Sequence, residues 1–316
     1  MALTGQLRHV VVLVGGVGGA KLAHGLAQIL PPGALTVIVN TGDDFWHYGL
    51  RICPDLDTVM YTLGGLVDRG QGWGVAEDTF TTLDALRRLG DDPWFRLGDR
   101  DLATHLRRTQ ALQAGWTLTQ ITEHLCQMLG ISQRILPMTD APVATIIETT
   151  TEGALPFQEY FVKHRWQPPV RALRLEGLAQ AALSEPVRAA LMSADAILIG
   201  PSNPWLSIAP ILLVPGLRDL LMGRAVPRVA LSPIVEGRAL KGPAAKLMVE
   251  LGYEPSARAV AAYYGDLVNG FVYDERDAHL QIATPATATF DTIMHSDTDR
   301  QALARKILSW IESELV

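Results

Sequence analysis

The chain has 316 residues, 48% of them hydrophobic, and a mean hydropathy of +0.16, so it is long and apolar enough to bury a sizeable core. Its net charge of −6 and its lack of a long basic run argue against a nucleic acid partner, because binding a phosphate backbone depends on clustered lysine and arginine. It has no apolar run long enough to cross a bilayer, no signal-peptide core and no C-x-x-C motif, so we expect a cytoplasmic protein without a membrane partner, disulfides, structural zinc or iron–sulfur clusters.

Strand-like and helical stretches alternate along most of the chain. Apolar, largely β-branched runs predict strands, and several are continuous, as expected for strands covered on both faces of a parallel sheet. These runs occupy residues 9–14, 35–39, 143–148, 195–199, 228–231 and 270–273. Leucine and isoleucine at helical spacing predict one helix after the first strand and another at the carboxyl terminus. The alternation predicts a doubly wound, mostly parallel, Rossmann-like α/β sheet, in a single nucleotide-binding domain over residues 1–316.

A glycine-rich turn, GGVGGAK, follows the first predicted strand and opens the first helix. Its glycines would let the backbone approach a ligand closely, and a helix amino terminus presents N–H groups and partial positive charge to an anion. The turn fits neither the G-x-G-x-x-G fingerprint nor a Walker A loop, and the alternative is a tight strand-to-helix connection. Lys21 either reaches a phosphate or is solvated. The candidate anion-binding residues are Gly15, Gly16, Gly18, Gly19 and Lys21.

Four aspartates follow the second predicted strand within fifteen residues: Asp43, Asp44, Asp55 and Asp57. They should lie near the carboxyl end of that strand, where open α/β sheets bind their ligands. Two carboxylates at ~4 Å repel each other by about 4 kcal/mol at an effective dielectric near 20, and a hard cation bound to phosphate oxygens would remove that cost. Alternatively, individual aspartates are turn formers or helix caps. Cys53, in the same segment, is interpreted as a small buried apolar residue.

Residues 77–133 interrupt the alternation. Thr117 and Gln120 fit a capping box before a run of apolar residues at helical spacing, and Gly130 suits the end of that helix. No convincing strand occurs here. We therefore expect a helical insertion between two strands of the sheet, acting as a lid or as part of a dimer interface.

Within the insertion, the sequence WFRLGDRDLATH over residues 94–105 mixes charges of both signs. An exposed ion-pair network is the ordinary interpretation of such a run. Beside two aromatic residues, however, Arg96 could clamp a flat aromatic substrate. His47 and His105 are acid–base candidates by residue type, but each is more readily interpreted as a structural hydrogen bonder.

Two later strand ends repeat the pattern of anion-binding loops. GPSNP follows the strand at 195–199, and a serine–proline pair followed by KGPAAK comes after the strand at 228–231. Ser202 and Asn203 can donate hydrogen bonds to phosphate oxygens or cap a helix, and the sequence does not choose between these roles. Three such loops on one sheet, together with the acidic segment, favour a phosphorylated ligand held with a divalent cation.

Six segments carry a resemblance to a known family. They are LVGGVGGAKL, VNTGDDFWHYGLRICPDLDTVMYTLGG, GWGVAEDTF, WFRLGDRDLATHLRRTQ, GPSNPWLSI and SPIVEGRALKGPAAKLM. In these segments the chain resembles the 2-phospho-L-lactate transferase family, which makes the precursor of the deazaflavin coenzyme F-420. The matching segments run in order from about residue 11 to residue 274, and they look closer to the bacterial branch, which uses phosphoenolpyruvate or phospholactate, than to the archaeal one.

The resemblance implies a Mg²⁺-dependent transfer between two small molecules. The terminal ribityl hydroxyl of the deazaflavin Fo attacks a donor in which guanosine monophosphate is joined through a diphosphate to phospholactate or phosphoenolpyruvate. The phospho-acid unit moves to Fo, and GMP leaves. The resemblance also implies a homodimer.

Carried over residue by residue, the resemblance assigns Asp57 and Asp55 to the metal and the acceptor hydroxyl, as the catalytic residues. Asp43 and Asp44 complete the implied metal site. Arg96 is assigned to Fo, with Trp46 as a stacking surface for it. The donor is assigned to the glycine-rich turn and a later loop, through Gly15, Gly16, Gly18, Gly19, Lys21, Ser202 and Asn203.

Two other classes of function remain alternatives. A non-catalytic nucleotide-sugar-binding regulatory protein on the same scaffold is the stronger one, but a pure binder needs no cluster of aspartates. A dinucleotide-dependent oxidoreductase is the weaker one, because the third glycine is missing and Asn40 stands near the place of the acidic ribose-binding residue.

Overall fold

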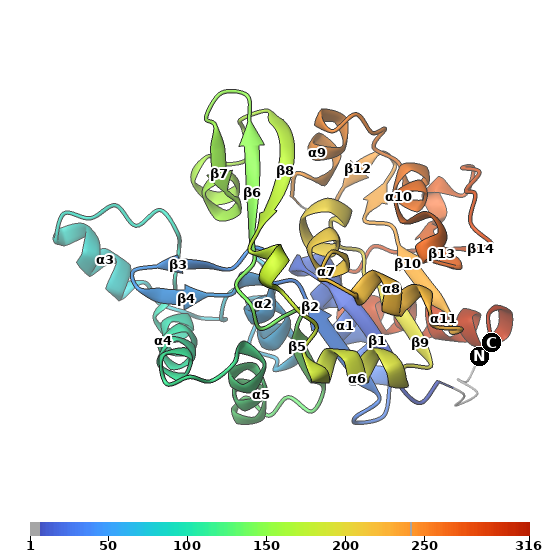
Figure 1. Ribbon diagram of the computed structural model, residues 1–316, viewed down its shortest axis with the longest axis horizontal. Coiled ribbons are helices and arrows are strands. Elements are labelled where there is room, and N and C mark those ends of the chain that lie inside the picture. Colours follow the sequence, from blue (N-terminus) through green and yellow to red (C-terminus); the bar gives the residue numbers. More distant parts are fainter. Residues whose placement is uncertain (1–6, 241) are drawn as a thin grey trace.

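The computed structural model describes residues 7–240 and 242–316, and its centre is an all-parallel sheet of seven strands (Figure 1). The strand order is β14-β13-β10-β9-β1-β2-β5, and every neighbouring pair is parallel. The strands are β1 Val10–Val14, β2 Leu35–Val39, β5 Arg134–Pro137, β9 Ala196–Ile199, β10 Arg228–Leu231, β13 Gly270–Asp274 and β14 Ala286–Phe290. The predicted α/β fold is confirmed.

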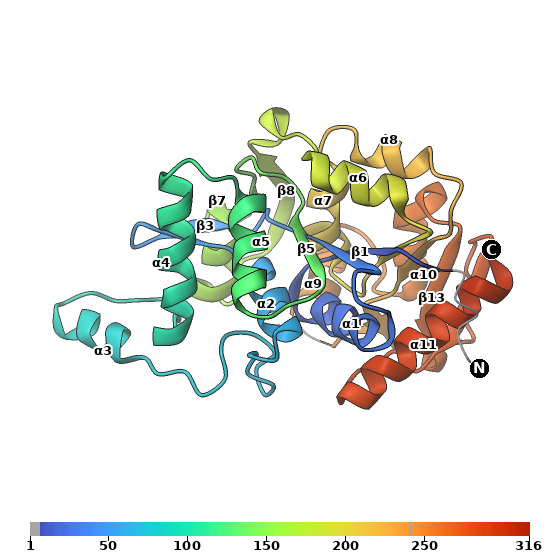
Figure 2. The same ribbon diagram turned by 90° about the horizontal axis from the view of Figure 1, so that it is seen from below.

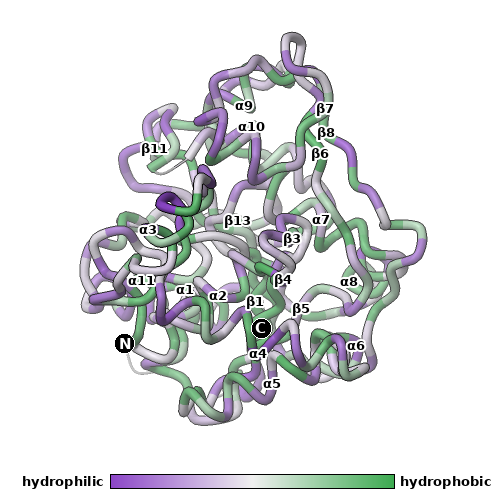
Figure 3. The backbone as a smooth tube through the Cα atoms, turned by 90° about the vertical axis from the view of Figure 1, so that its left-hand side faces the viewer, coloured by the Kyte–Doolittle hydropathy of each residue, from purple (hydrophilic) through white to green (hydrophobic). Residues whose placement is uncertain are grey.

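Helices cover both faces of this sheet (Figure 2). On one face lie α1 Gly16–Ile29, α2 Pro54–Leu63 and α11 Asp297–Glu314, and on the other lie α6 Glu185–Ser193, α7 Ala209–Leu212, α8 Leu217–Met222 and α10 Ala257–Tyr264. The strand β1 is buried along its whole length, with Val10 and Val12 in one hydrophobic core and Val11 and Leu13 in the other. Burial on both faces explains why this run is continuously apolar. In Figure 3, which colours the backbone by hydropathy, β1 lies in a hydrophobic region.

Residues 143–148 were expected to form a strand of the main parallel sheet, and this expectation was wrong. They form a strand of a separate sheet. This strand is β6, the middle strand of an antiparallel sheet with β7 and β8 that stands at the top of Figure 1. Two short hairpins, β3–β4 and β11–β12, complete the strands. Their bounds are β3 Phe45–His47, β4 Leu50–Ile52, β6 Ala144–Thr149, β7 Ala154–Pro156, β8 Val170–Glu176, β11 Ile234–Val235 and β12 Arg238–Ala239.

Residues 77–133 contain helices and no strand, as predicted. These helices are α3 Thr81–Arg88, α4 Asp99–Gln113 and α5 Leu118–Met128. A further helix, α9 Ala244–Glu250, lies outside this region and contacts β8. The expected capping box opens α5, because Thr117 accepts from the Gln120 N–H and the Gln120 side chain accepts from the Thr117 N–H. Gly130, with φ +68°, lies just past the end of α5. The helix α3 projects away from the body of the molecule (Figures 1 and 2).

The carboxyl ends of β1, β2 and β9 meet at one edge of the sheet because these strands are parallel neighbours. From β1 the chain continues to β2, which is the neighbour of β1 on one side in the sheet. The later strands β9 and β10 are added on the opposite side of β1. The order therefore reverses beside β1, and open α/β sheets bind ligands at such a reversal. None of the helices in the described ranges is both long and apolar enough to cross a membrane.

Close packing of α1 against α11 requires a glycine at position 25. A Cβ there would overlap the carbonyl oxygen of Arg300 on α11. We expect Gly25→Ala to lower the free energy of unfolding by about 1–3 kcal/mol, because the overlap outweighs the gain in helix propensity. Urea denaturation measures this. Gly223→Ala is the control, because a Cβ at Gly223 meets its neighbours at ordinary contact distance. Equal stability of the two variants would contradict the packing.

Candidate functional site

The carboxylate of Asp55 joins three loops at the carboxyl edge of the sheet. One oxygen accepts a hydrogen bond from the Gly16 N–H at 2.8 Å, and the other accepts from the Asn40 side-chain amide at 2.9 Å. Gly16 begins α1, Asn40 follows β2, and Asp55 lies in the first turn of α2. A Cβ at Gly15 would lie 2.5 Å from the same carboxylate. Asp55 thus fixes the glycine-rich turn against the acidic segment.

The other glycines of the turn allow it to pack against the loop that follows β9. The Ser202 hydroxyl accepts from the Gly15 N–H at 3.1 Å and donates to the Gly15 carbonyl at 2.8 Å. A Cβ at Gly18 or Gly19 would lie 2.5 Å from the Pro201 carbonyl oxygen or 2.6 Å from the Ser202 hydroxyl. These contacts account for the glycines without a ligand. Gly15 provides no N-cap side chain for α1, and the Gly16 N–H donates to Asp55 instead.

Two of the expected donor-binding residues have structural partners of their own. Lys21 donates from Nζ to the Met294 carbonyl at 2.7 Å, which ties α1 to the segment before α11. Asn203 caps the π-helical segment Pro204–Ile208, because its side-chain oxygen accepts from two of the first backbone N–H groups. The capping role left open for Asn203 is therefore the one that these contacts support.

Asp43, Asp44 and Asp55 are buried, and burial raises the pKa of all three. Burial raises the pKa of Asp43 well above its usual range, and the charges of Asp55 and Asp44 raise it further. Burial raises the pKa of Asp44 to about 7, against the opposing effect of Arg51, and that of Asp55 to about 6. Asp43 Oδ1 has no hydrogen-bond partner among the described residues. Burial is the largest cause of all three shifts, so each carboxylate is costly to ionise in this site.

Asp57 points to a different side of α2 from Asp55, because residues two apart on a helix do not face each other. Both of its oxygens contact the guanidinium of Arg108 on α4, one of them at 3.1 Å from Nη1. Arg108 is fully buried. His105 lies 3.6 Å from Asp57 and 3.2 Å from Asp101, whose carboxylate accepts from the Tyr61 hydroxyl at 2.6 Å. This buried network joins α2 to α4.

The acidic residues thus form two groups that differ in how their charge is balanced. Asp57, Asp101 and His105 have ligand atoms within 4.8 Å of one another and could hold a metal ion. Arg108 already places a cation on Asp57, however. For Asp43 and Asp55, no cationic side chain is among the groups that shift the pKa. Their oxygens fit a hard divalent cation better, because hydrogen bonds but no cationic side chain offset their charge.

The hairpin β3–β4 places Trp46 on the same face as Arg51. Tyr48 and Gly49 have positive φ values of 50° and 73°, which suit the tight turn between these strands. Trp46 pairs with Arg51 across the hairpin, and directly opposed residues share a face. Arg51 Nη2 contacts Asp44 at 3.3 Å, and the Trp46 side chain is 58% exposed. Trp46 is thus available as a stacking surface beside the acidic segment.

Arg96 lies at the surface of the insertion. Its guanidinium carbon is 3.9 Å from the centre of the Phe80 ring. Within the described residues it has no hydrogen bond or ion pair to any of the four aspartates. Trp94 and Phe95, its neighbours in sequence, pack instead on Phe45 of the hairpin. The structure therefore does not bring Arg96 together with the acidic segment by direct contact.

Sequence reasoning missed Asn40, Arg51 and Arg108 as members of this site. Asn40 holds Asp55 and, through its side-chain oxygen, accepts from the Gly42 N–H at 2.8 Å. A signal for Arg108 was present, because Asp101, His105 and Arg108 recur at helical spacing and so share one face of α4. The buried Cys53, whose pKa is raised by burial, agrees with its interpretation as a small apolar residue.

The pair formed by Arg108 and Asp57 should be essential for stability, because removing one partner leaves a buried charge. We expect Arg108→Met to lower the free energy of unfolding by about 3–5 kcal/mol, and the double variant with Asp57→Asn to recover most of that loss. Urea denaturation of the single and double variants measures the coupling. Arg171→Met, at an exposed ion pair on β8, should have a far smaller effect. Additive effects of the two buried substitutions would contradict the pairing.

The raised pKa of Asp44 predicts a pH-dependent stability difference. In the folded metal-free protein the carboxylate is penalised by burial, so the penalty grows as pH rises from about 4, where the unfolded chain ionises, to about 7. Asp44→Asn avoids it. The variant should gain stability relative to the parent by up to about 4 kcal/mol across that interval, since one pKa unit corresponds to ~1.4 kcal/mol.

The measurement for Asp44 is urea denaturation between pH 4.5 and pH 8 in the presence of a chelator. Asp84→Asn on the exposed helix α3 serves as the control. A difference between Asp44→Asn and the parent that stays constant over this range would show that Asp44 carries no burial penalty.

Comparison with known proteins agrees with the resemblance in sequence. The family model described as 2-phospho-L-lactate transferase CofD matches residues 10–316. The chain is 42% identical to the 2-phospho-L-lactate transferase of Methanosarcina mazei, covering 94% of this chain and 99% of that relative. It is 44% identical to the phosphoenolpyruvate transferase of Streptomyces coelicolor, covering 96% and 98% respectively.

A solved structure shows the same fold at low sequence identity. The crystal structure of a UPF0052 family member from Bacillus halodurans matches with a TM-score of 0.61 at 16% identity, covering 95% of this chain and 99% of that one. This likeness concerns the fold alone. The match of the family model over nearly the whole length, together with the two transferases, shows that the chain belongs to the 2-phospho-L-lactate transferase family.

Proposed function

We propose that this protein transfers a phospho-acid unit, phospholactate or phosphoenolpyruvate, from a guanosine-diphosphate-activated donor to the ribityl hydroxyl of the deazaflavin Fo in coenzyme F-420 biosynthesis. Membership of the transferase family supports this activity over a regulatory or oxidoreductase role. The observation that carries the proposal is the pair of buried carboxylates without a cationic partner, Asp43 and Asp55, beside the amino terminus of α1. A diphosphate and a divalent cation complement those two features.

The reaction exchanges one phosphorus–oxygen bond for another. The ribityl oxygen forms a bond to the phosphorus that carries the acid, and the bond from this phosphorus to the bridging oxygen breaks. GMP leaves with the electron pair, and the hydroxyl proton is released. Negative charge builds up on the bridging and equatorial oxygens, so catalysis consists mainly of positioning and neutralisation.

Asp43 and Asp55 would hold Mg²⁺, which would neutralise the diphosphate. Asp43 has an unpartnered oxygen, and Asp55 already fixes the glycine-rich turn that we assign to the donor. Asp44 and Asp57 are the other expected metal ligands, but Arg51 and Arg108 contact them. We assign Asp57 to the acceptor side instead, where Arg108 would orient its carboxylate toward the ribityl chain.

The glycine-rich turn would hold the donor's phosphates through its backbone. Ser202 would act through Gly15, whose peptide it fixes on both sides, rather than by direct contact with phosphate. Asn203 would act in the same indirect way, by capping the segment that packs behind the turn. Lys21, which donates to Met294, is left out of this assignment.

The helical insertion at residues 77–133 would form the acceptor side of the site. Trp46 offers an exposed ring for the deazaflavin, and Arg96 would approach it from the surface of the insertion. The homodimer stays a prediction. The exposed Leu106 and Met128, on α4 and α5, lie on the surface that we expect it to use.

Replacing Asp43 should abolish transfer without unfolding the protein. We expect Asp43→Asn to lower kcat by about 100-fold or more at saturating Mg²⁺, since the uncompensated charge that attracts the cation is halved. Mass spectrometry of the product formed from Fo and each candidate donor measures the rate. Asp84→Asn is again the control. Undiminished turnover by a folded Asp43→Asn protein would refute the assignment.

A further inference from the structure

The hairpin β3–β4 has two faces with different neighbours. Trp46 shares one face with Arg51, its partner across the hairpin, and Arg51 contacts Asp44 in the acidic segment. Phe45 and His47 flank Trp46 on β3, so their side chains point to the opposite face, because successive residues of a strand alternate. The face away from the acidic segment is therefore aromatic.

That aromatic face packs on the segment before α4. The ring of Phe95 meets Phe45 edge-on with ring centres 4.9 Å apart, and the ring of Trp94 lies 5.9 Å from Phe45. His47 contacts the same two rings, at 5.3 Å from Trp94 and 6.0 Å from Phe95. Edge-on and tilted pairs at such distances are favourable for aromatic side chains. These four residues, which we call the aromatic cluster, hold the hairpin against the helical insertion.

The segment from residue 78 to residue 99 is closed at its base by two aspartates. Asp78, which precedes α3, accepts from two backbone N–H groups in the first turn of α4, at 2.8 and 3.1 Å. Asp99, which begins α4, accepts from two in the first turn of α3, at 2.9 and 3.0 Å. Each aspartate thus caps the helix that the other one borders. Gly98 permits this closure, because a Cβ there would overlap the Asp78 carboxylate.

The base and the aromatic cluster are the attachments that orient this segment. Helix α3 itself contributes little, since Leu83 is its one buried residue and the helix projects from the body (Figure 1). Arg96 directly follows the two rings of the aromatic cluster in the sequence, and its guanidinium is held over the ring of Phe80. Trp46 lies in the hairpin on the other side of the same cluster. The aromatic cluster therefore sets where Trp46 lies relative to Arg96.

We propose that Trp94 and Phe95 are positioning residues for the acceptor. Through the rest of the aromatic cluster they fix Trp46 relative to Arg96, the two side chains assigned above to the deazaflavin. The inference rests on the proposed function, which supplies that acceptor. Two contacts that are held in place before binding lose less conformational entropy than two mobile ones, so the aromatic cluster strengthens acceptor binding. The glycine-rich turn is fixed by other residues, and the donor side is independent of the cluster.

Isothermal titration with Fo and, separately, with GDP tests this role. We expect Trp94→Ala to weaken Fo binding about five- to tenfold, the scale of one or two aromatic contacts, and to leave the affinity for GDP within about twofold of the parent's. Trp94→Phe should restore most of the affinity for Fo, because a ring remains in the aromatic cluster. In the transfer reaction, Trp94→Ala should raise the KM for Fo and leave kcat unchanged.

Hydrogen exchange supplies a readout that needs no ligand. The backbone amides of residues 45–52 should exchange faster in Trp94→Ala than in the parent, because the hairpin loses its support from the insertion. Those of α9, which lies outside the insertion, should exchange as in the parent. Circular dichroism establishes that each variant is folded.

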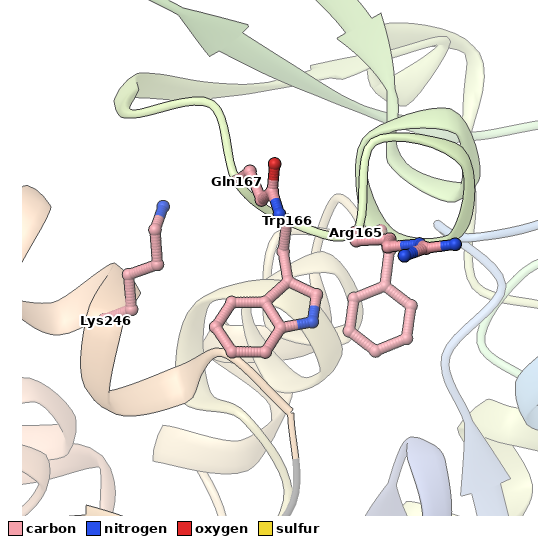
Figure 4. Close-up of a pocket in the computed structure, with 5 residues that line it drawn as sticks. Arg165, Trp166, Gln167 and Lys246 are labelled. Carbon is pink, nitrogen blue, oxygen red and sulfur yellow. The ribbon is translucent and has the colours of Figure 1, made fainter.

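Trp166→Ala is the matched control. Trp166 is 40% exposed and lines a pocket with Arg165, Gln167 and Lys246, beside α9 rather than beside the hairpin (Figure 4). Its replacement should leave both the affinity for Fo and the exchange of residues 45–52 unchanged.

Three results would overturn the positioning role in a parent that binds Fo. The folded Trp94→Ala protein could bind Fo like the parent, or lose affinity for Fo and GDP equally, or lose Fo while the hairpin exchanges as before. The last result would mean that Trp94 touches the acceptor itself. A parent that binds no Fo refutes the proposed function, and this inference with it.

Discussion

The hydrogen bonds of the Asp55 carboxylate are the constraint on which the arrangement of the site depends. They join the start of α1, the end of β2 and the start of α2 at one point on the carboxyl edge of the sheet. The glycines at positions 15, 18 and 19 permit this closeness, because side chains there would overlap Asp55, Pro201 and Ser202. The glycine-rich turn and the acidic segment, which lie well apart in the sequence, thereby meet at one place.

The distribution of charge around Asp55 would let such a site be stable and still bind the proposed cation. Arg51 and Arg108 offset Asp44 and Asp57, and these pairs hold the hairpin and α4 in place. Asp43 and Asp55 lack such cationic partners, and burial raises the pKa of both, as it raises that of Asp44 despite Arg51. Burial of the charged form thus costs stability at Asp43, Asp44 and Asp55, and a divalent ion bound at Asp43 and Asp55 would restore part of it while neutralising a diphosphate. The two arginines limit how many of the four aspartates are free to bind metal.

The sequence predicts the sheet and most of the helices because the central strands are buried on both faces and so are continuously apolar. It misses the edge strands β5 and β14, because the first is only four residues long and the second is half-buried and rich in alanine and threonine. It assigns residues 143–148 to the wrong sheet, since an apolar run does not reveal its pairing partner. It groups Asp55 with Asp57 by proximity, whereas helix geometry separates them. Helical spacing groups Arg108 with Asp101 and His105, but it does not reveal the tertiary contact with Asp57, fifty-one residues earlier.

Diffraction at a wavelength suited to manganese, from crystals grown with Mn²⁺ and GDP, tests the central claim most directly. An anomalous peak between the carboxylates of Asp43 and Asp55, beside the glycine-rich turn, is the result expected from the charge distribution. A peak between Asp57, Asp101 and His105 with Arg108 displaced, or no peak near either group, would contradict it.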